Sequence, residues 1–125
     1  MLLRSKDKEA LLQIFSSVDT PLEVWAYGSR VNGTAHEGSD LDLVIRTGSL
    51  QKLPIDIFLT IKDKIRESNI PIPVEIFDWA TLPENFHRNI DAQHEVLYSN
   101  LGMMVNEPRA EYKKKEQKGD LGPGN

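Results

Sequence analysis

Hydrophobic and polar residues follow two different periods along the first hundred positions of the chain. Three stretches place apolar residues every three or four positions, which is typical of amphipathic helices, and they begin near Ser5, Pro54 and Thr81. Four shorter stretches are rich in strand formers and bounded by turn residues: 22–27, 40–45, 74–78 and 95–98. Helices and strands therefore succeed one another, and the pattern predicts an α/β (α+β) domain.

The third predicted helix carries a start signal in its sequence. Thr81 and Glu84 have the spacing of a capping box, in which the hydroxyl and the carboxylate satisfy free backbone amides. Behind this box, Leu82, Phe86 and Ile90 share one helical face. We expect that face to be the apolar, core-facing side of the helix.

Composition limits the chain to one folded unit of globular type. It has 125 residues, of which 39% are hydrophobic and 27% charged, and this length suits a single core. The periodic pattern stops near position 106, so we expect a domain over 1–105 and a disordered tail over 106–125. Residues 1–105 hold 10 basic and 15 acidic side chains, a net charge of −5. Direct binding to DNA is therefore not expected.

The chain also lacks the features of membrane and disulfide-bonded proteins. No apolar run approaches the roughly 18 residues that span a bilayer, and Arg4 interrupts the start too early for a signal-peptide core. We therefore expect a soluble, cytoplasmic protein. The sequence has no cysteine, so a metal would be held by oxygen or by the three histidines, which favours hard cations.

Two aspartates stand on the second predicted strand. Alternate side chains share one face of a strand, so Asp40 and Asp42 point the same way with α-carbons about 6.8 Å apart. Neighbouring carboxylates disfavour each other's ionisation, and a divalent cation reverses that effect. Mg²⁺ binds one or two protein carboxylates and fills its other positions with water and phosphate oxygens. The alternative is that both aspartates form the solvent face of an amphipathic strand.

A second candidate lies where the first predicted strand ends. Gly28 lets the backbone approach a ligand closely, and the Ser29 hydroxyl can donate to a phosphate oxygen. A short helical turn through residues 30–32 would aim backbone amides at an anion. This corner is therefore a candidate triphosphate site, although Gly-Ser is also an ordinary turn dipeptide.

The joint spacing of these residues is informative. Gly-Ser followed after ten residues by Asp-x-Asp arises by chance in roughly one chain of this length in several hundred. With Gly28-Ser29 and Asp40-Leu41-Asp42 the sequence resembles the nucleotidyltransferase superfamily related to DNA polymerase beta, specifically its minimal, single-domain members. The resemblance extends over most of residues 20–98. It implies a mixed sheet of four or five strands flanked by helices.

The family places a third metal-pocket carboxylate on a later strand. Two acids stand in that region here, Glu75 and Asp78, and an unbroken strand points them to opposite faces. Alignment with the family selects Glu75, where the family usually has aspartate. The resemblance implies that Glu75 is the general base or supports a second metal ion.

The resemblance also implies an activity. A member of this family transfers a nucleoside monophosphate from ATP or another NTP to an acceptor and releases pyrophosphate. Asp40, Asp42 and Glu75 would then be the catalytic and metal-binding residues for two Mg²⁺ ions. Gly28, Ser29 and Arg30 would bind the nucleotide.

A small chain has no room for the extra domains with which larger relatives bind their substrates. The resemblance therefore implies a separate small helical partner, either a substrate-binding subunit or a HEPN-type toxin that an antitoxin adenylylates on tyrosine. The chain would then work in a homo- or hetero-oligomer. Two alternative hypotheses assign the chain to other functional classes. It would be a catalytically weak or inactive nucleotide-binding subunit that acts by contact, or a structural subunit with an incidental Asp-x-Asp.

Several other residues carry open or modest expectations. Arg30 has two alternative roles, a phosphate contact or a structural pairing with the acidic strand. Trp25 and Trp79 fall on predicted strands and favour core positions over base stacking. The three histidines have no metal-ligand spacing, so we expect them on the surface: His36, His87 and His94.

Overall fold

The computed structural model describes residues 2–36 and 38–101. Its four strands form one mixed sheet in the order β3-β2-β1-β4. β1 (Leu22–Tyr27) lies between β2 (Leu41–Thr47) and β4 (Glu95–Ser99) and runs antiparallel to both, whereas β3 (Val74–Asp78) runs parallel to β2. The expected α/β class and mixed sheet are confirmed, with four strands among the described residues.

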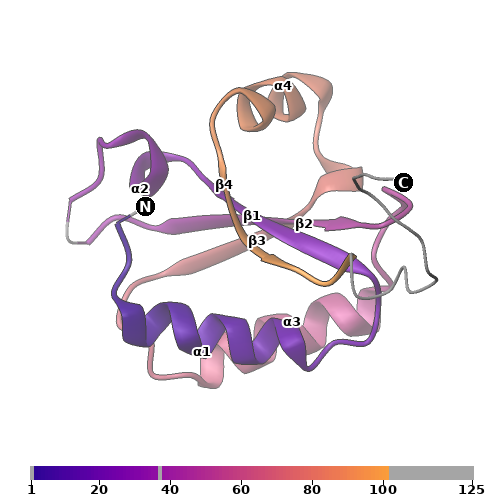
Figure 1. Ribbon diagram of the computed structural model, residues 1–125, viewed down its shortest axis with the longest axis horizontal. Helices are drawn as coiled ribbons and strands as arrows, with labels where there is room; N and C mark the ends of the chain where they lie inside the picture. Colours follow the sequence, from indigo (N-terminus) through magenta and orange to yellow (C-terminus); the bar gives the residue numbers. More distant parts are fainter. Residues whose placement is uncertain (1, 37, 102–125) are drawn as a thin grey trace, which may run out of the picture.

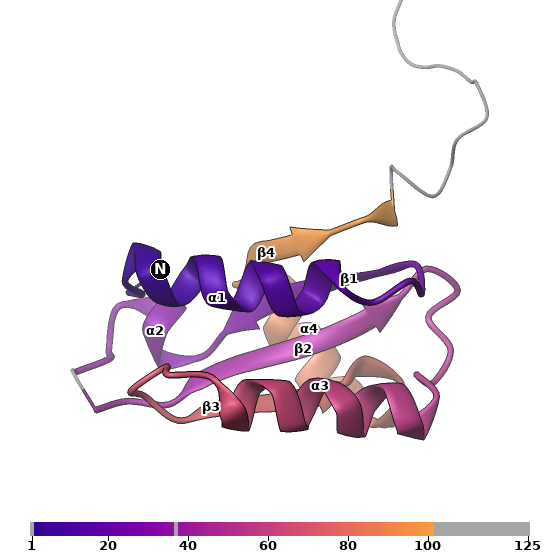
Figure 2. The same ribbon diagram turned by 90° about the horizontal axis from the view of Figure 1, so that it is seen from below.

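Helices cover the two faces of this sheet unequally (Figure 1). α1 (Ser5–Ser16) and α3 (Ile55–Glu67) lie on one face, and α4 (Glu84–Ala92) lies on the other. The four-residue helix α2 (Ser29–Asn32) follows β1 directly, and a 3₁₀ turn, η1 (Trp79–Thr81), follows β3. In the view from below, α1 and α3 run side by side across the sheet (Figure 2).

The main core lies under α1 and α3. Leu11 and Phe15 of α1 and Ile61 of α3 are fully buried against inward-facing strand residues. A smaller apolar cluster on the opposite face contains Trp25, Val44, Trp79 and Ile90. Since both faces bear apolar clusters, β1 and β2 are buried along most of their length, as their near-continuous apolar sequences require.

The start of α4 corrects the predicted capping box. The helix begins at Glu84 with Pro83 at its N-cap, and no side chain caps it. The Thr81 hydroxyl instead donates to the Asp78 carbonyl at 2.9 Å, because residues 79–81 form the 3₁₀ turn that ends β3. Phe86 is 45% exposed, so the expected apolar face packs only through Ile90 and, partly, Leu82.

Two further observations concern the chain as a whole. No helix in the described ranges is long and apolar enough to cross a membrane. The expected domain end at residue 105 and the expected disordered tail over 106–125 lie outside the described residues.

Candidate functional site

Three neighbouring strands bring a row of side chains together on the sheet face that α4 partly covers. In the register, Asp42 of β2 is paired with Tyr27 of β1 on one side and with Glu75 of β3 on the other. Directly paired residues of adjacent strands point to the same face. Asp42 and Glu75 are therefore neighbours, although 32 intervening residues separate them in the sequence. Asp40 precedes β2 by one residue and is exposed.

The electrostatics of Asp42 reflect this crowding. Partial burial raises the pKa of its carboxyl, and the negative charges of Asp40 and Glu75 raise it further. A raised pKa means that the fold holds the ionised form at a cost. A cation placed among these three carboxylates would remove that cost, so the site favours positive ligands.

Gly28 closes the site from the β1 side. Its φ of +83° and ψ of −157° lie in a region that only glycine adopts readily. A β-carbon at this position would stand 2.6 Å from Oδ2 of Asp42. The turn therefore needs glycine twice, for its backbone angles and for its close approach to the carboxylate, and it starts α2 at Ser29 immediately beside Asp42.

Tyr27 forms a wall of the site next to Asp42. Its ring is tilted against that of Phe77, with centroids 6.4 Å apart. Burial, with a smaller contribution from the charge of Asp42, raises the pKa of the Tyr27 phenol to about 12. The phenol is therefore neutral at physiological pH and can donate a hydrogen bond.

Arg30 is buried, and its guanidinium faces the protein backbone. Nε donates to the carbonyl of Ser39 at 2.9 Å, and Nη1 donates to the carbonyl of Leu2 at 2.7 Å. These contacts are structural, and they join Arg30 to backbone carbonyls, whereas the structural alternative had expected a pairing with the acidic strand. Arg30 thus fixes the end of the loop that leads into Asp40. A phosphate contact by Arg30 stays a prediction.

Asp78, the other acid of β3, is part of the fold. It is buried, its Oδ2 accepts from the amide of Leu53 at 2.8 Å, and its Oδ1 accepts from the amide of Ala80 at 3.0 Å. Strand parity separates it from Glu75, so only Glu75 shares the face of Asp42.

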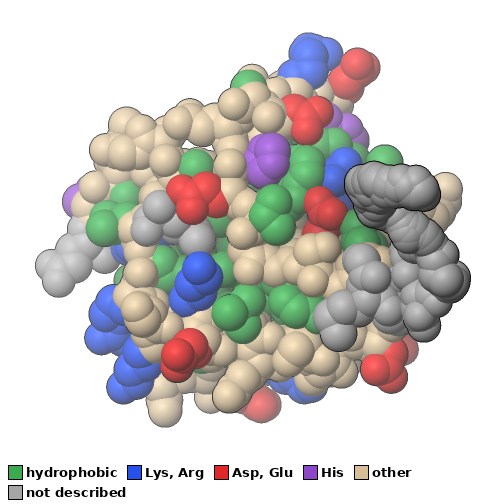
Figure 3. Space-filling view, in the orientation of Figure 1, with side chains coloured by type: hydrophobic (Ala, Val, Ile, Leu, Met, Phe, Trp, Pro, Cys, Tyr) green, Lys and Arg blue, Asp and Glu red, His purple; other side chains and the backbone are tan. Residues whose placement is uncertain are grey.

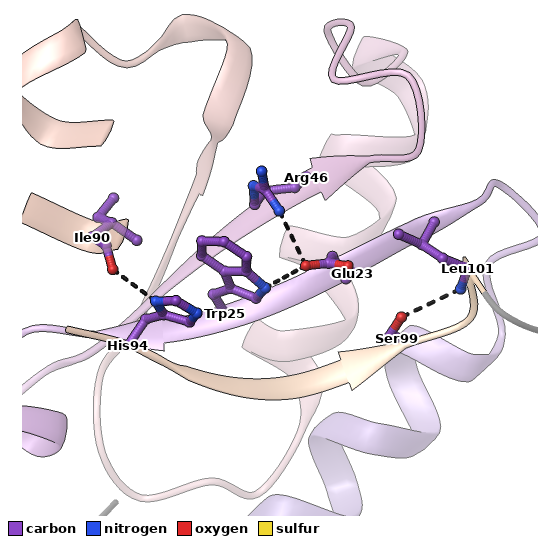
Figure 4. Close-up of polar contacts among 7 residues, drawn as sticks. All are labelled: Glu23, Trp25, Arg46, Ile90, His94, Ser99 and Leu101. Carbon is purple, nitrogen blue, oxygen red and sulfur yellow. Dashed lines mark hydrogen bonds and ion pairs between the residues drawn. The ribbon is translucent and has the colours of Figure 1, made fainter. Parts of the chain in front are cut away.

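A cationic and aromatic cluster covers the other end of the same sheet face, and no sequence motif indicates it. The Arg46 guanidinium lies 3.9 Å from the ring centroid of Trp25 and 4.5 Å from that of Trp79. Its Nη1 pairs with Oε1 of Glu23 at 3.1 Å, and the same oxygen accepts from the Trp25 indole (Figure 4). The register between β1 and β2 is the signal that would have indicated this cluster, because it pairs Glu23 with Arg46.

Two histidines belong to this cluster, which corrects their expected surface positions. His94 stacks on Trp25 with centroids 3.7 Å apart, and His87 stacks on Trp79 at 3.9 Å. Each ring also bonds a backbone carbonyl, that of Ile90 or Trp79. In the space-filling view a histidine lies among hydrophobic side chains below α4 (Figure 3). The two tryptophans are 92% buried, as expected of core residues, and only His36 is exposed.

The acidic residues fit a metal ion that is completed by its substrate. Within 2–36 and 38–101, no three His, Asp or Glu side chains are arranged as a ready-made metal site. Mg²⁺ needs only one or two protein carboxylates when phosphate oxygens and water supply the rest. Asp40 and Asp42 provide that number, and the raised pKa of Asp42 marks a position where a cation is favoured.

Comparison with known proteins agrees with this geometry. The family model described as Polymerase beta, Nucleotidyltransferase matches residues 9–101. A curated relative from Haemophilus influenzae, described as "Probable protein adenylyltransferase MntA", is 33% identical over 97 residues, which are 76% of this chain and 82% of the relative.

Solved structures share the fold at low sequence identity. A toxin–antitoxin crystal structure with AMP-PNP has a TM-score of 0.60 and 15% identity over 74% of this chain and 73% of that one. The toxin–antitoxin MntA-HepT has a TM-score of 0.51 and 9% identity over 82% and 80% of the two chains. By family match, sequence identity and fold, the chain belongs to the polymerase beta nucleotidyltransferase family.

Proposed function

We propose that the chain transfers the adenylyl group of ATP, with Mg²⁺, to a hydroxyl of a partner protein. The observation that carries this proposal is the row formed by Asp42 and Glu75, with Asp40 beside it and the Gly28 turn closing over Asp42. These carboxylates can bind cations. They lie beside a turn that has room for no residue larger than glycine. Family membership and the adenylyltransferase relative support the same reaction.

Asp40 and Asp42 would hold the magnesium, with Glu75 as a further ligand for a second ion. When bound, two such ions supply Lewis-acid stabilisation of charge on the α-phosphate and on the departing pyrophosphate. The contribution of the protein to this step is to hold the carboxylates of adjacent strands in fixed positions. Hydrogen bonding of the Arg30 guanidinium to the Ser39 carbonyl keeps Asp40 next to β2.

Glu75 has two alternative roles, metal ligand or general base, and as the base it would act on the acceptor hydroxyl. It is exposed, so an acceptor can reach it, and it lies next to Asp42 in the register. Glu75 takes the proton of the acceptor hydroxyl, the acceptor oxygen forms a bond to the α-phosphorus, and the bond from that phosphorus to the bridging oxygen breaks. Pyrophosphate leaves with the electron pair of that bond.

Gly28 and Ser29 would hold the β- and γ-phosphates. Gly28 removes side-chain bulk where the backbone meets Asp42, and α2 begins at Ser29 beside the carboxylates. An amide and a hydroxyl at this position can both donate to phosphate oxygens.

A HEPN-type toxin is the proposed partner and acceptor. The relative is described as a protein adenylyltransferase, and solved neighbours of the same fold are toxin–antitoxin complexes, one of them with AMP-PNP. Those descriptions belong to those proteins, and they support the choice of a protein acceptor here.

Calorimetric titration of ATP, with and without Mg²⁺, tests the nucleotide site. We expect Mg²⁺-dependent binding to wild type and none to the variant Asp40→Asn/Asp42→Asn. The variant Asp19→Asn/Asp91→Asn removes the same charge at exposed positions elsewhere and should bind like wild type. Binding that survives the loss of Asp40 and Asp42 would refute the proposed site.

A second function has one observation in its favour. Glu75 is one methylene longer than the aspartate usual in the family, and a misplaced base would leave a nucleotide-binding subunit that acts by contact. Pyrophosphate release with the partner present separates the two. Turnover that falls in Glu75→Gln supports catalysis, whereas nucleotide binding without turnover in both wild type and Glu75→Asp supports the silent subunit.

A further inference from the structure

β3 is an edge strand with one free side. The sheet order places β2 on one side of β3, and no described strand pairs with the other. The carbonyl of Pro73, just before β3, accepts from the amide of Leu41. Backbone groups of successive strand residues point in opposite directions, so those of Val74 and Ile76 point outward. An edge of this kind is a template for an added strand.

A groove runs between this edge and α3. One hollow of about 330 Å³ is lined by Lys62, Ile65 and Arg66 of α3 and by Val74–Ile76. A second hollow of about 280 Å³ lies further along, and its lining includes Ile55 and Phe58 together with residues 76–78. Both hollows have Ile76 in their lining, so they adjoin each other along the strand.

The exposed stripe of α3 along the groove changes from apolar to cationic. On α3, Ile55 is 60% and Leu59 is 50% exposed, and Lys62 and Arg66 continue the same helical stripe one and two turns later. Arg66 pairs with Asp63 at 2.6 Å, whereas Lys62 makes no ion pair with a described residue. Beside the start of β3 the hollow therefore has Lys62 and Arg66 among mostly apolar lining residues, with Glu75 as its one acid. Beside the end of β3 the apolar lining is accompanied by Lys52 and Asp78. Two cations on the α3 side stand out in residues 1–105, whose net charge is −5.

We propose that this groove binds an extended, acidic segment of the acceptor protein, which adds to the sheet as a strand beside β3. The inference rests on the proposed function and names the surface that recognises its protein substrate. Acidic side chains of the segment lie near Lys62 and Arg66, and apolar ones lie near Ile55 and Phe58. Main-chain hydrogen bonds to β3 supply affinity, and the alternate side chains supply specificity.

Strand parity explains how such a segment reaches the reactive site. Side chains of an added strand alternate between the two faces of the sheet. One set enters the groove on the α3 face. The other set lies on the opposite face beside Glu75, whose neighbour in the register is Asp42. A hydroxyl residue in the second set is thus presented to the carboxylates while its neighbours anchor the segment.

Fluorescence anisotropy with synthetic peptides and the full chain tests the groove. The probe is a labelled nine-residue peptide with alternating isoleucines and valines, two glutamates at one end and one tyrosine of opposite parity, made in both chain directions. A matched probe carries lysines in place of the glutamates. We expect at least tenfold tighter binding of one glutamate probe, and a reversed preference in the variant Lys62→Glu/Arg66→Glu.

Two controls separate strand addition from general attraction. The variant Lys6→Glu/Lys8→Glu makes the same charge change on α1 and should keep the wild-type preference. Backbone N-methylation of the probe at residues of one parity should abolish binding, and methylation at the other parity should leave it intact, because only one set of amides faces β3.

Several results would overturn the proposal: no binding of any probe, equal binding of glutamate and lysine probes, or equal effects of both methylation patterns. Self-association seen by sedimentation in the wild type and lost in Lys62→Glu/Arg66→Glu would show a second copy on this edge and would also overturn the proposal. Calorimetry with Mg²⁺ and ATP does not involve the groove. A failure of nucleotide binding therefore refutes the proposed function, and a failure of the peptides refutes the groove.

Discussion

Replacing Gly28 with alanine tests the geometry on which the candidate site depends. The backbone angles at Gly28, φ +83° and ψ −157°, are in a glycine-only region that costs other residues about 1–3 kcal/mol. In addition, the new β-carbon would stand 2.6 Å from Oδ2 of Asp42, closer than van der Waals contact allows. We expect Gly28→Ala to lower the free energy of unfolding by about 2–4 kcal/mol, the sum of strain and displacement of Asp42.

Gly33→Ala is the matched control. Gly33 has φ +88° and ψ 4°, the left-handed helical region, and a β-carbon there would meet nothing within 4 Å. This substitution should cost only about 1–2 kcal/mol. Urea denaturation followed by far-ultraviolet circular dichroism measures both values on the same scale.

A double-mutant cycle isolates the close approach. Asp42→Ala removes the carboxylate and leaves only an ordinary contact of 3.7 Å to its β-carbon. Gly28→Ala should therefore be less costly in the Asp42→Ala background by about 1 kcal/mol or more. If the coupling is zero and Gly28→Ala costs no more than Gly33→Ala, the Gly28 turn does not pack on Asp42, and the proposed site loses its geometry.

Three further predictions follow from the same sheet face. Asp42→Asn should raise the free energy of unfolding at pH 7 in the absence of Mg²⁺. The raised pKa favours the protonated acid, so the stabilising contribution of Asp42 is full below its ordinary pKa of 3.8 and is lost as pH rises through the pKa of the folded state. Urea denaturation at several pH values measures this, and a destabilised variant contradicts it. In Tyr27→Phe, the phenolate absorbance step near pH 12 should disappear, and loss of a step near pH 10 would contradict the burial of that phenol. Arg46→Ala should lower the free energy of unfolding by about 2–3 kcal/mol in thermal unfolding, because it breaks a partly buried ion pair and two ring contacts. Arg88→Ala, which breaks an exposed ion pair, should lower it by under about 0.5 kcal/mol. Equal losses would show that the cluster adds no stability.

The strands and the acidic pair could be predicted because their signals are local. β1 and β3 have the expected bounds, since short runs of strand formers between turn residues leave few alternatives. Strand parity predicts a shared face for Asp40 and Asp42, although β2 begins one residue later than expected, at Leu41. The partner of Asp42 on the next strand did not follow from local pattern, because register between distant strands is set by the whole core.

The capping box failed for a related reason. Thr81 and Glu84 have the required spacing, but η1 extends the end of β3 and engages the Thr81 hydroxyl with Asp78. A local motif is overridden when the preceding element already satisfies its polar groups. The stacked histidines escaped prediction similarly: nothing adjacent in sequence to His94 indicates that a tryptophan about 70 positions earlier lies beneath it.

The two ends of the sheet face that α4 partly covers differ in their electrostatics. At one end, the Arg46 guanidinium pairs with Glu23 and lies against the rings of Trp25 and Trp79. At the other end, Asp42 lies beside Asp40 and Glu75, and burial together with these two negative charges raises its pKa. The first end thus pairs its cation with a carboxylate and two rings, although Arg46 Nε is buried without a hydrogen-bond partner in the described part of the chain, whereas the second end places acids side by side. The Mg²⁺ proposed for this site would offset the repulsion among these carboxylates, and with Mg²⁺ bound Asp42→Asn should cease to be stabilising.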